Sequence, residues 1–158
     1  MTTITGAFDA IRSRLESGTY TDGTGASLTS WLRFQGEDAD DLPNVPAPFA
    51  YIELENYGAG RGPTAFGGGS GNNLYRNEGL INAYVFVPNG QGLRVAVAQA
   101  EQIAARMRSF RDSDVSCFSA SVHPIGDGTS IAPKGLNSEV NNYTCAVVEI
   151  AFHFDQTG

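Results

Sequence analysis

The stretch "LINAYVFVPNGQGLRVAVAQAEQIAARM", residues 80–107, contains a strand, a turn and a helix in direct succession. Residues 80–87 are apolar on both alternating faces, which predicts a strand in the interior of a sheet. Pro88, Asn89 and Gly90 end that strand with turn-forming residues. Apolar residues then recur at helical spacing over about five turns: Leu93, Val97, Ala100, Ile103, Met107 and Phe110. The unit therefore predicts an amphipathic helix packed on its own strand.

Other segments predict further strands on both sides of this unit. "FAYIELENY", residues 49–57, alternates in the manner of a half-buried antiparallel strand. Its predicted buried face is Ala50, Ile52 and Leu54, and its predicted outer face is Tyr51, Glu53 and Glu55. "YTCAVVEIAFHF", residues 143–154, places Thr144, Ala146, Val148, Ile150, Phe152 and Phe154 on one buried face. Shorter strands are predicted at residues 31–34 and 114–124.

A first helix is predicted near the start of the chain. Ile4, Phe8, Ile11 and Leu15 repeat at four, three and four residues, which places them on one helical face. Thr3 or Thr5 is suited to cap its start, and Gly18 marks its end. Residues 1–158 thus form one domain of the α+β class, with a mainly antiparallel sheet, two amphipathic helices on one side and a long Gly-rich hairpin loop.

The glycine-rich loop raises the question of a phosphate site, because residues 58–71 include seven glycines. A Walker A loop counted from Gly62 fails, since Gly68 and Gly69 stand where the lysine and the hydroxyl residue are required. The dinucleotide pattern in "GRGPTA", residues 60–65, needs a helix to follow at once, and Pro63 together with the next glycines prevents one. The segment is therefore predicted to be the tip of a long hairpin.

Charge argues against nucleic-acid recognition, because 17 acidic and 10 basic residues give a formal charge of −7. Binding to DNA by phosphate neutralisation needs a positive face. The chain begins without a signal-peptide pattern and contains no apolar run long enough to span a membrane, so we expect a soluble protein made in the cytoplasm, with no membrane partner. Cys117 and Cys145 are expected to be buried free thiols.

The sequence contains no convincing constellation for catalysis or metal binding. Cys117, His123, Cys145 and His153 are separated along two strands by six and eight residues, or about 20 to 26 Å. One zinc ion needs all its ligands within about 2.3 Å. The acidic run at residues 37–41 lacks the spacing of a calcium loop, and no serine lies in a nucleophile elbow. We therefore expect no enzyme activity, no cofactor and no metal.

The order of elements resembles a known family. The segments that carry the resemblance are "FDAIRSRLES", "NVPAPFAYIELE", "RNEGLINAYVFVPNGQG", "RVAVAQAEQIAARM" and "YTCAVVEIAFHF". Their succession is similar to that of the tail terminator proteins of long-tailed phages and gene transfer agents, including the lambda-type tail terminator. The resemblance covers nearly the whole chain in order and pattern. The chain departs from it in long insertions at residues 58–73 and 126–142.

This resemblance implies a structural virion protein at the head-proximal end of a phage tail. Such a subunit forms a hexameric ring on the finished tail tube, ends tube polymerisation and offers a docking surface to the head-tail connector or stopper protein. The expected partners are other copies of the chain, the tail tube protein and that connector. DNA is expected to pass through the lumen without specific binding, because six copies at −7 each carry −42 formal charges.

The glycine-rich hairpin is the predicted contact with a neighbouring subunit or with the tube. Arg61 and Phe66 are its only large side chains, and Tyr75 and Arg76 follow on the next strand. These four residues are the predicted contact residues. Two alternatives remain open: a tail tube or other neck subunit, and a small-ligand binding module that uses aromatic residues such as Trp31, Tyr84 and Phe86.

Overall fold

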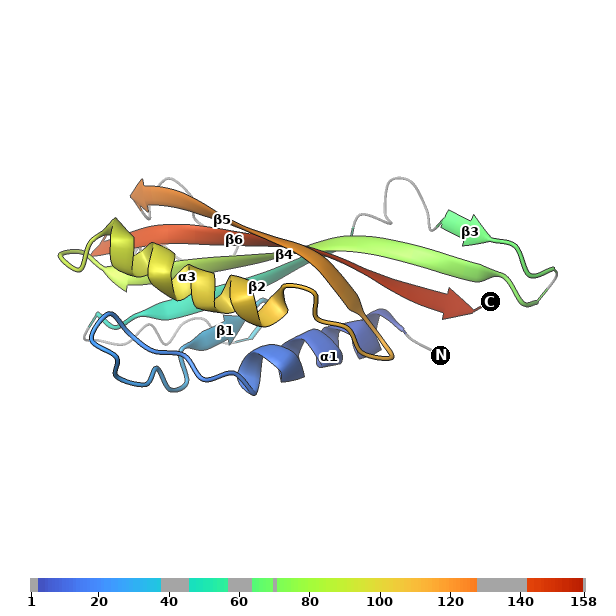
Figure 1. Ribbon diagram of the computed structural model, residues 1–158, viewed down its shortest axis with the longest axis horizontal. Helices are drawn as coiled ribbons and strands as arrows, with labels where there is room; N and C mark the ends of the chain where they lie inside the picture. The colour runs from blue at the N-terminus through green and yellow to red at the C-terminus, as the bar shows by residue number, and fades with distance from the viewer. Residues whose placement is uncertain (1–2, 38–45, 57–63, 70, 128–141, 158) are drawn as a thin grey trace.

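The computed structural model describes residues 3–37, 46–56, 64–69, 71–127 and 142–157. Within these ranges, two helices lie on one side of a six-stranded sheet with the strand order β1-β2-β4-β6-β5, and β3 pairs with β4 outside that order (Figure 1). The elements are α1 (Ile4–Glu16), β1 (Leu32–Phe34), β2 (Phe49–Asn56), β3 (Thr64–Phe66), β4 (Leu74–Pro88), α3 (Leu93–Met107), β5 (Ser116–Asp127) and β6 (Tyr143–Thr157). All strand pairs are antiparallel except β1 with β2. The predicted α+β class is confirmed.

The two longest strands, β4 and β6, form the centre of the sheet. They pair without interruption from Leu74 opposite Thr157 to Pro88 opposite Tyr143. The sequence predicted this strand only from residue 80, because residues 75–78 are polar and carry no apolar pattern. Pairing with β6 extends it by six residues. β2 and β4 are antiparallel neighbours. Residues 58–63 and 70 of the predicted glycine-rich tip lie outside the described residues, whereas its residues Thr64–Phe66 form the strand β3 and not a loop, because they pair with β4.

The main core lies between the helices and one face of the sheet. The predicted inward face of β6 is confirmed for its apolar residues, because Ala146, Val148, Ile150, Phe152 and Phe154 all belong to this core. From α3 the buried residues are Ala96, Gln99, Ala100, Ile103, Ala104 and Met107. The prediction was wrong at the ends of this helix. Leu93 is 38% exposed, and Phe110 lies beyond the last helical residue, Met107.

α1 contacts the sheet through a face rotated from the predicted one. Thr3 caps the helix, because its side-chain oxygen accepts a hydrogen bond from the Gly6 N–H at 3.0 Å. Ala7, Ile11 and Leu15 are buried, whereas Phe8 remains 38% exposed and Ile4 42% exposed. The small Ala7 side chain permits close packing at a point where the sequence pattern favoured the larger Phe8.

A second apolar cluster lies on the helix-free face of the sheet. It contains Phe49, Tyr51, Phe86, Tyr143, Cys145 and Val147. The Phe49 and Phe86 rings stack with centroids 4.8 Å apart, and the Tyr143 ring meets Phe49 edge-on at 5.2 Å. Tyr51 and Glu53 thus lie on the predicted face of β2, but the expectation that this face is open is wrong for both, since Tyr51 is 2% exposed and Glu53 7%. Strand alternation indicates which residues share a face but not what covers that face.

Candidate interaction surface

The sheet continues beyond the body of the molecule as a narrow arm. β2 ends opposite Gly79, and β5 begins opposite His153. Among the described residues, the pairs beyond these points join residues 74–78 of β4 to residues 153–157 of β6 and to β3. We call these three segments the arm. Figure 1 shows it reaching past the end of α3, so the arm offers exposed strand edges away from the helix-covered body.

Two of the four predicted contact residues meet on this arm. The Arg76 guanidinium carbon lies 5.2 Å from the centroid of the Phe66 ring, a cation–π contact between β4 and β3. Phe66 is 44% exposed, and all three residues of β3 are exposed. Tyr75 precedes Arg76 in the same strand and so lies on the opposite face of the sheet. Arg61 lies outside the described residues.

Asp155 is a partner that the sequence did not reveal. The Arg76 Nε–H and Nη2–H groups donate to the two carboxylate oxygens of Asp155 at 2.8 and 2.9 Å. This two-point geometry fixes the guanidinium plane. Hydrogen bonding to Arg76 lowers the pKa of Asp155, and the same bond raises the pKa of Arg76. Only the β4–β6 register places the two residues opposite each other, and nothing in their sequence separation indicates it.

His153 lies at the base of the arm. It is directly opposite Glu78 on β4, and its ring centroid is 5.6 Å from that of Phe118. Partial burial lowers the pKa of His153, and the charge of Arg76 lowers it further. The imidazole therefore favours its neutral form at neutral pH.

Polar residues continue along the helix-free face from the arm into the body. Glu53 accepts a hydrogen bond from the Tyr84 hydroxyl at 3.1 Å. Glu149 pairs with His123, with 3.1 Å between Nε2 and Oε2. Alternation along the paired strands places five carboxylates on this face: Glu53, Glu55, Glu78, Glu149 and Asp155. The face is thus acidic next to a buried aromatic cluster.

The residues considered for zinc do not converge. Cys117 belongs to the core under the helices, and Cys145 to the cluster on the opposite face. Burial raises the pKa of each thiol to about 12, with the Asp112 charge adding to the effect at Cys117. Within the described ranges, no three His, Cys, Asp or Glu side chains are grouped so that they could hold a metal ion.

The aromatic residues of the ligand-binding alternative are also separated. Trp31 belongs to the helix-side core, whereas Phe86 is fully buried in the other cluster and Tyr84 packs beside it. A cavity of about 260 Å³ adjoins Trp31, Tyr20 and Glu16, but neither Tyr84 nor Phe86 lines it. The three aromatics therefore do not share one binding site.

Comparisons with other proteins supply no relative from which a role could be transferred. The sequence was compared with models of protein families and with curated proteins, and neither comparison gives a match. In the described part of the chain, no helix has both the length and the apolar character needed to cross a membrane.

Proposed function

We propose that this chain is a structural virion protein that caps the head-proximal end of a phage tail tube as a hexameric ring. In this role it ends tube polymerisation and presents a docking surface to the head-tail connector or stopper. The observation that carries the proposal is the arm. Its exposed Phe66 lies beside an Arg76 whose orientation is fixed by Asp155, which suits it to contact a neighbouring protein.

The arm has the physical properties of an assembly contact. Main-chain groups at the free edges of strands pair readily with a strand of another chain. An exposed aromatic residue next to an oriented arginine is the combination enriched at the energetic centres of protein interfaces. We assign the arm to contact with the end of the tail tube or with an adjacent subunit.

The acidic helix-free face supports the proposed route for DNA. Five carboxylates lie on that face among the described residues, against the two arginines Arg33 and Arg76. A duplex that passes such a face meets repulsion rather than adhesive phosphate contacts. A lumen found to be strongly basic in the assembled particle would contradict this part of the proposal.

A tail tube or other neck subunit is the second candidate, because an arm with free strand edges also suits subunits that stack. The two functions differ in how assembly stops. A tube subunit polymerises into long tubes under mild conditions, whereas a terminator stops at a ring or remains monomeric. Electron microscopy of the purified protein in negative stain separates the two outcomes.

The decisive experiment uses tails assembled without the protein. We expect tails longer than normal that do not join heads, because nothing halts tube growth or offers the connector its docking surface. When the purified protein is present during assembly, tails should reach normal length and should join heads again. Tails of normal length that still join heads in its absence would refute the proposed function.

A further inference from the structure

We infer that neighbouring copies in the ring meet head to tail through opposite edges of the sheet. An aromatic and basic patch on the edge strand β5 of one copy docks into an acidic-rimmed groove between α1 and β1 of the next. This inference rests on the proposed ring function and identifies its subunit interface. The β5-edge patch contains no residue of the arm but adjoins its base, where the ring centroids of Phe118 and His153 are 5.6 Å apart, and the rest of the arm remains available to the tube.

The first surface, here called the β5-edge patch, consists of Arg108, Arg111 and Phe118. Phe118 lies at an irregularity in the pairing of β5 with β6 and is 53% exposed, the highest value among the exposed large apolar side chains. Arg111 pairs through its main chain with Ser116, and the Arg108 side chain donates to the Ala120 carbonyl oxygen at 3.3 Å. The two contacts place the arginines beside Ser116 and Ala120, the β5 residues on either side of Phe118.

The two arginines of the patch lie outside the ion pairs of the described structure, and the neighbouring Asp112 carboxylate accepts hydrogen bonds from the Asp114 and Val115 N–H groups. Arg108 and Arg111 are exposed, and neither forms an ion pair with another described residue. An exposed phenylalanine beside two arginines that form no described ion pair is unusual on a chain with a formal charge of −7. It is the composition expected of an interface centre rather than of a solvated surface.

The second surface, the α1–β1 groove, is a cavity of about 140 Å³ whose apolar lining is Phe8, Ile11, Phe34 and Leu54. Phe8 remains 38% exposed at its side. The volume is well below the roughly 300 Å³ at which small-molecule sites begin. The groove therefore suits a single inserted side chain better than a ligand.

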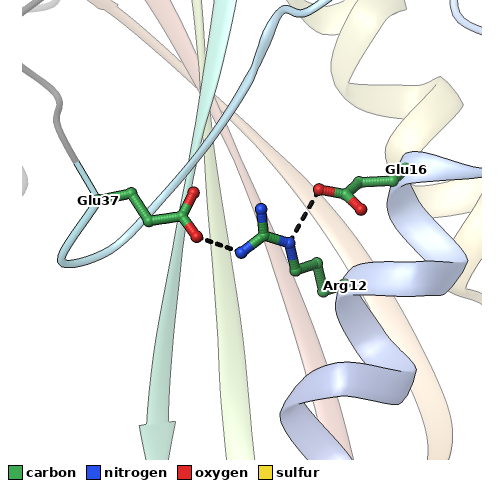
Figure 2. A network of polar contacts seen from close by, with 3 residues as sticks. All are labelled: Arg12, Glu16 and Glu37. Carbon is green, nitrogen blue, oxygen red and sulfur yellow. Dashed lines mark hydrogen bonds and ion pairs between the residues drawn. The ribbon is translucent and has the colours of Figure 1, made fainter.

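Carboxylates dominate the rim of this groove. Figure 2 shows Arg12 between Glu16 and Glu37, with a hydrogen-bonded ion pair to each. The Arg12 guanidinium carbon also lies 4.6 Å from the centroid of the Phe34 ring. One arginine is thus matched by two carboxylates, and Asp9 adds a third. The charged residues that line the groove, Asp9, Arg12 and Glu37, carry a net formal charge of −1, and Glu16 beside Arg12 adds a further carboxylate; this acidic rim complements the two arginines of the β5-edge patch.

The positions of the two surfaces decide how the copies are arranged. β1 and β5 are the first and last strands of the sheet order, at opposite edges in Figure 1. A contact between two different patches of identical subunits is heterologous, and it closes into a ring when the rotation between copies permits. Two opposite edges let every copy both give and receive one such contact.

Charge reversal tests the electrostatic part of the inference. Arg111→Glu should raise the dissociation constant for self-association about tenfold or more, because it places a carboxylate against the acidic rim. Adding Asp9→Arg to the same chain should restore association, since each contact again joins opposite charges. Arg94→Glu, the same reversal on the exposed first turn of α3, is the matched control. Sedimentation velocity over a concentration series measures all four proteins, and equal effects of Arg111→Glu and Arg94→Glu would overturn the inference.

Cysteine cross-linking tests the geometry. Chains carrying Phe118→Cys and chains carrying Phe8→Cys are mixed in equal amounts at high concentration and oxidised mildly. The native Cys117 and Cys145 are fully buried and do not compete. We expect mixed disulfide dimers to exceed both like dimers at least about tenfold, because one variant supplies the patch and the other the groove. Like dimers in excess, or no cross-linking, would overturn the head-to-tail contact.

The outcomes also separate this inference from the function on which it rests. Closed rings that form without preferential mixed cross-linking would reject the β5-edge patch and leave the terminator role in place. Mixed cross-links with tails of normal length in the absence of the protein would support the interface and reject the terminator role.

Discussion

Arg14 and Arg106 each donate a hydrogen bond to the main-chain carbonyl of the other. Arg14 Nε lies 3.2 Å from the Arg106 oxygen, and Arg106 Nε lies 2.9 Å from the Arg14 oxygen. Both residues are in the last turn of their helices, where carbonyl groups lack partners within the helix. The negative ends of the two helix dipoles thus stabilise the two neighbouring guanidinium charges. The reciprocal hydrogen bonds connect the C-terminal end of α1 to that of α3.

Replacing one member should loosen the helix pair. Arg106→Ala removes the bond to Arg14 and a second bond, at 2.6 Å, to the Ser17 hydroxyl. We expect a decrease of about 1–2 kcal/mol in the free energy of unfolding, because bonds from a charged donor are lost at partly exposed positions. Urea denaturation followed by circular dichroism measures it. Arg94→Ala, at an exposed position of α3, should remain within about 0.5 kcal/mol of wild type. Equal effects would contradict the role of the pair.

Gly79 on β4 lies between β2 and β6 at a position that has no room for a side chain. A Cβ there would lie 2.6 Å from the Glu55 carbonyl oxygen and 2.5 Å from the Phe152 ring. Gly79→Ala should therefore lower the free energy of unfolding by about 1–3 kcal/mol through overpacking. The control is Gly67→Ala, because a Cβ on Gly67 meets nothing within 4 Å. Thermal unfolding of both variants tests the difference, and an unchanged midpoint for Gly79→Ala would contradict the close packing.

The Arg76–Asp155 pair predicts a dependence of stability on acid. Its hydrogen bonds hold the pKa of Asp155 below the ordinary 3.8, so the unfolded chain binds a proton at a higher pH than the folded chain does. The contribution is complete above the unfolded pKa and is lost as pH falls through the lower folded value. The stability difference between wild type and Asp155→Asn should be constant at neutral pH and shrink below about pH 4. Urea titrations of both proteins at several pH values measure it, and a constant difference would contradict the ionised pair.

The two thiols should be inert in the folded protein. Burial raises the pKa of Cys117 and of Cys145 to about 12, so the reactive thiolate is scarce at pH 8. Iodoacetamide should label neither residue in native buffer and both in denaturant, as mass spectrometry of the intact chain would show. Rapid native labelling at one site would indicate that the corresponding side of the sheet opens locally.

The arm should affect assembly without affecting folding. Phe66→Ala removes an exposed ring that contacts Arg76, so stability should change by no more than about 0.5 kcal/mol. Association with tail tubes, measured by co-sedimentation, should nevertheless decrease. Removal of residues 60–70 should have the same effect, and Thr64→Ala on the same exposed strand provides the control. Normal association after both changes would remove the arm from the proposed contact.

The sequence by itself determined the described helices and every described strand except β3, and it indicated which side of most of them is apolar. The unit at residues 80–107 and the alternation at residues 143–154 specify their elements locally, because backbone geometry turns residue spacing directly into faces. The same local signals limited the cap of the first helix to Thr3 or Thr5, and the structure shows Thr3 in that role. The α+β class follows from the order of those elements.

Only the tertiary structure decided the partners across elements. The register of β4 with β6 joins Arg76 to Asp155 and extends β4 into the arm, and a register depends on contacts between residues far apart in the chain. Tyr51 and Glu53 are buried on a face that alternation predicted to be open, while Phe8 is left exposed beside a groove. Spacing along one element determines which side chains point the same way, and only packing between elements determines what they meet.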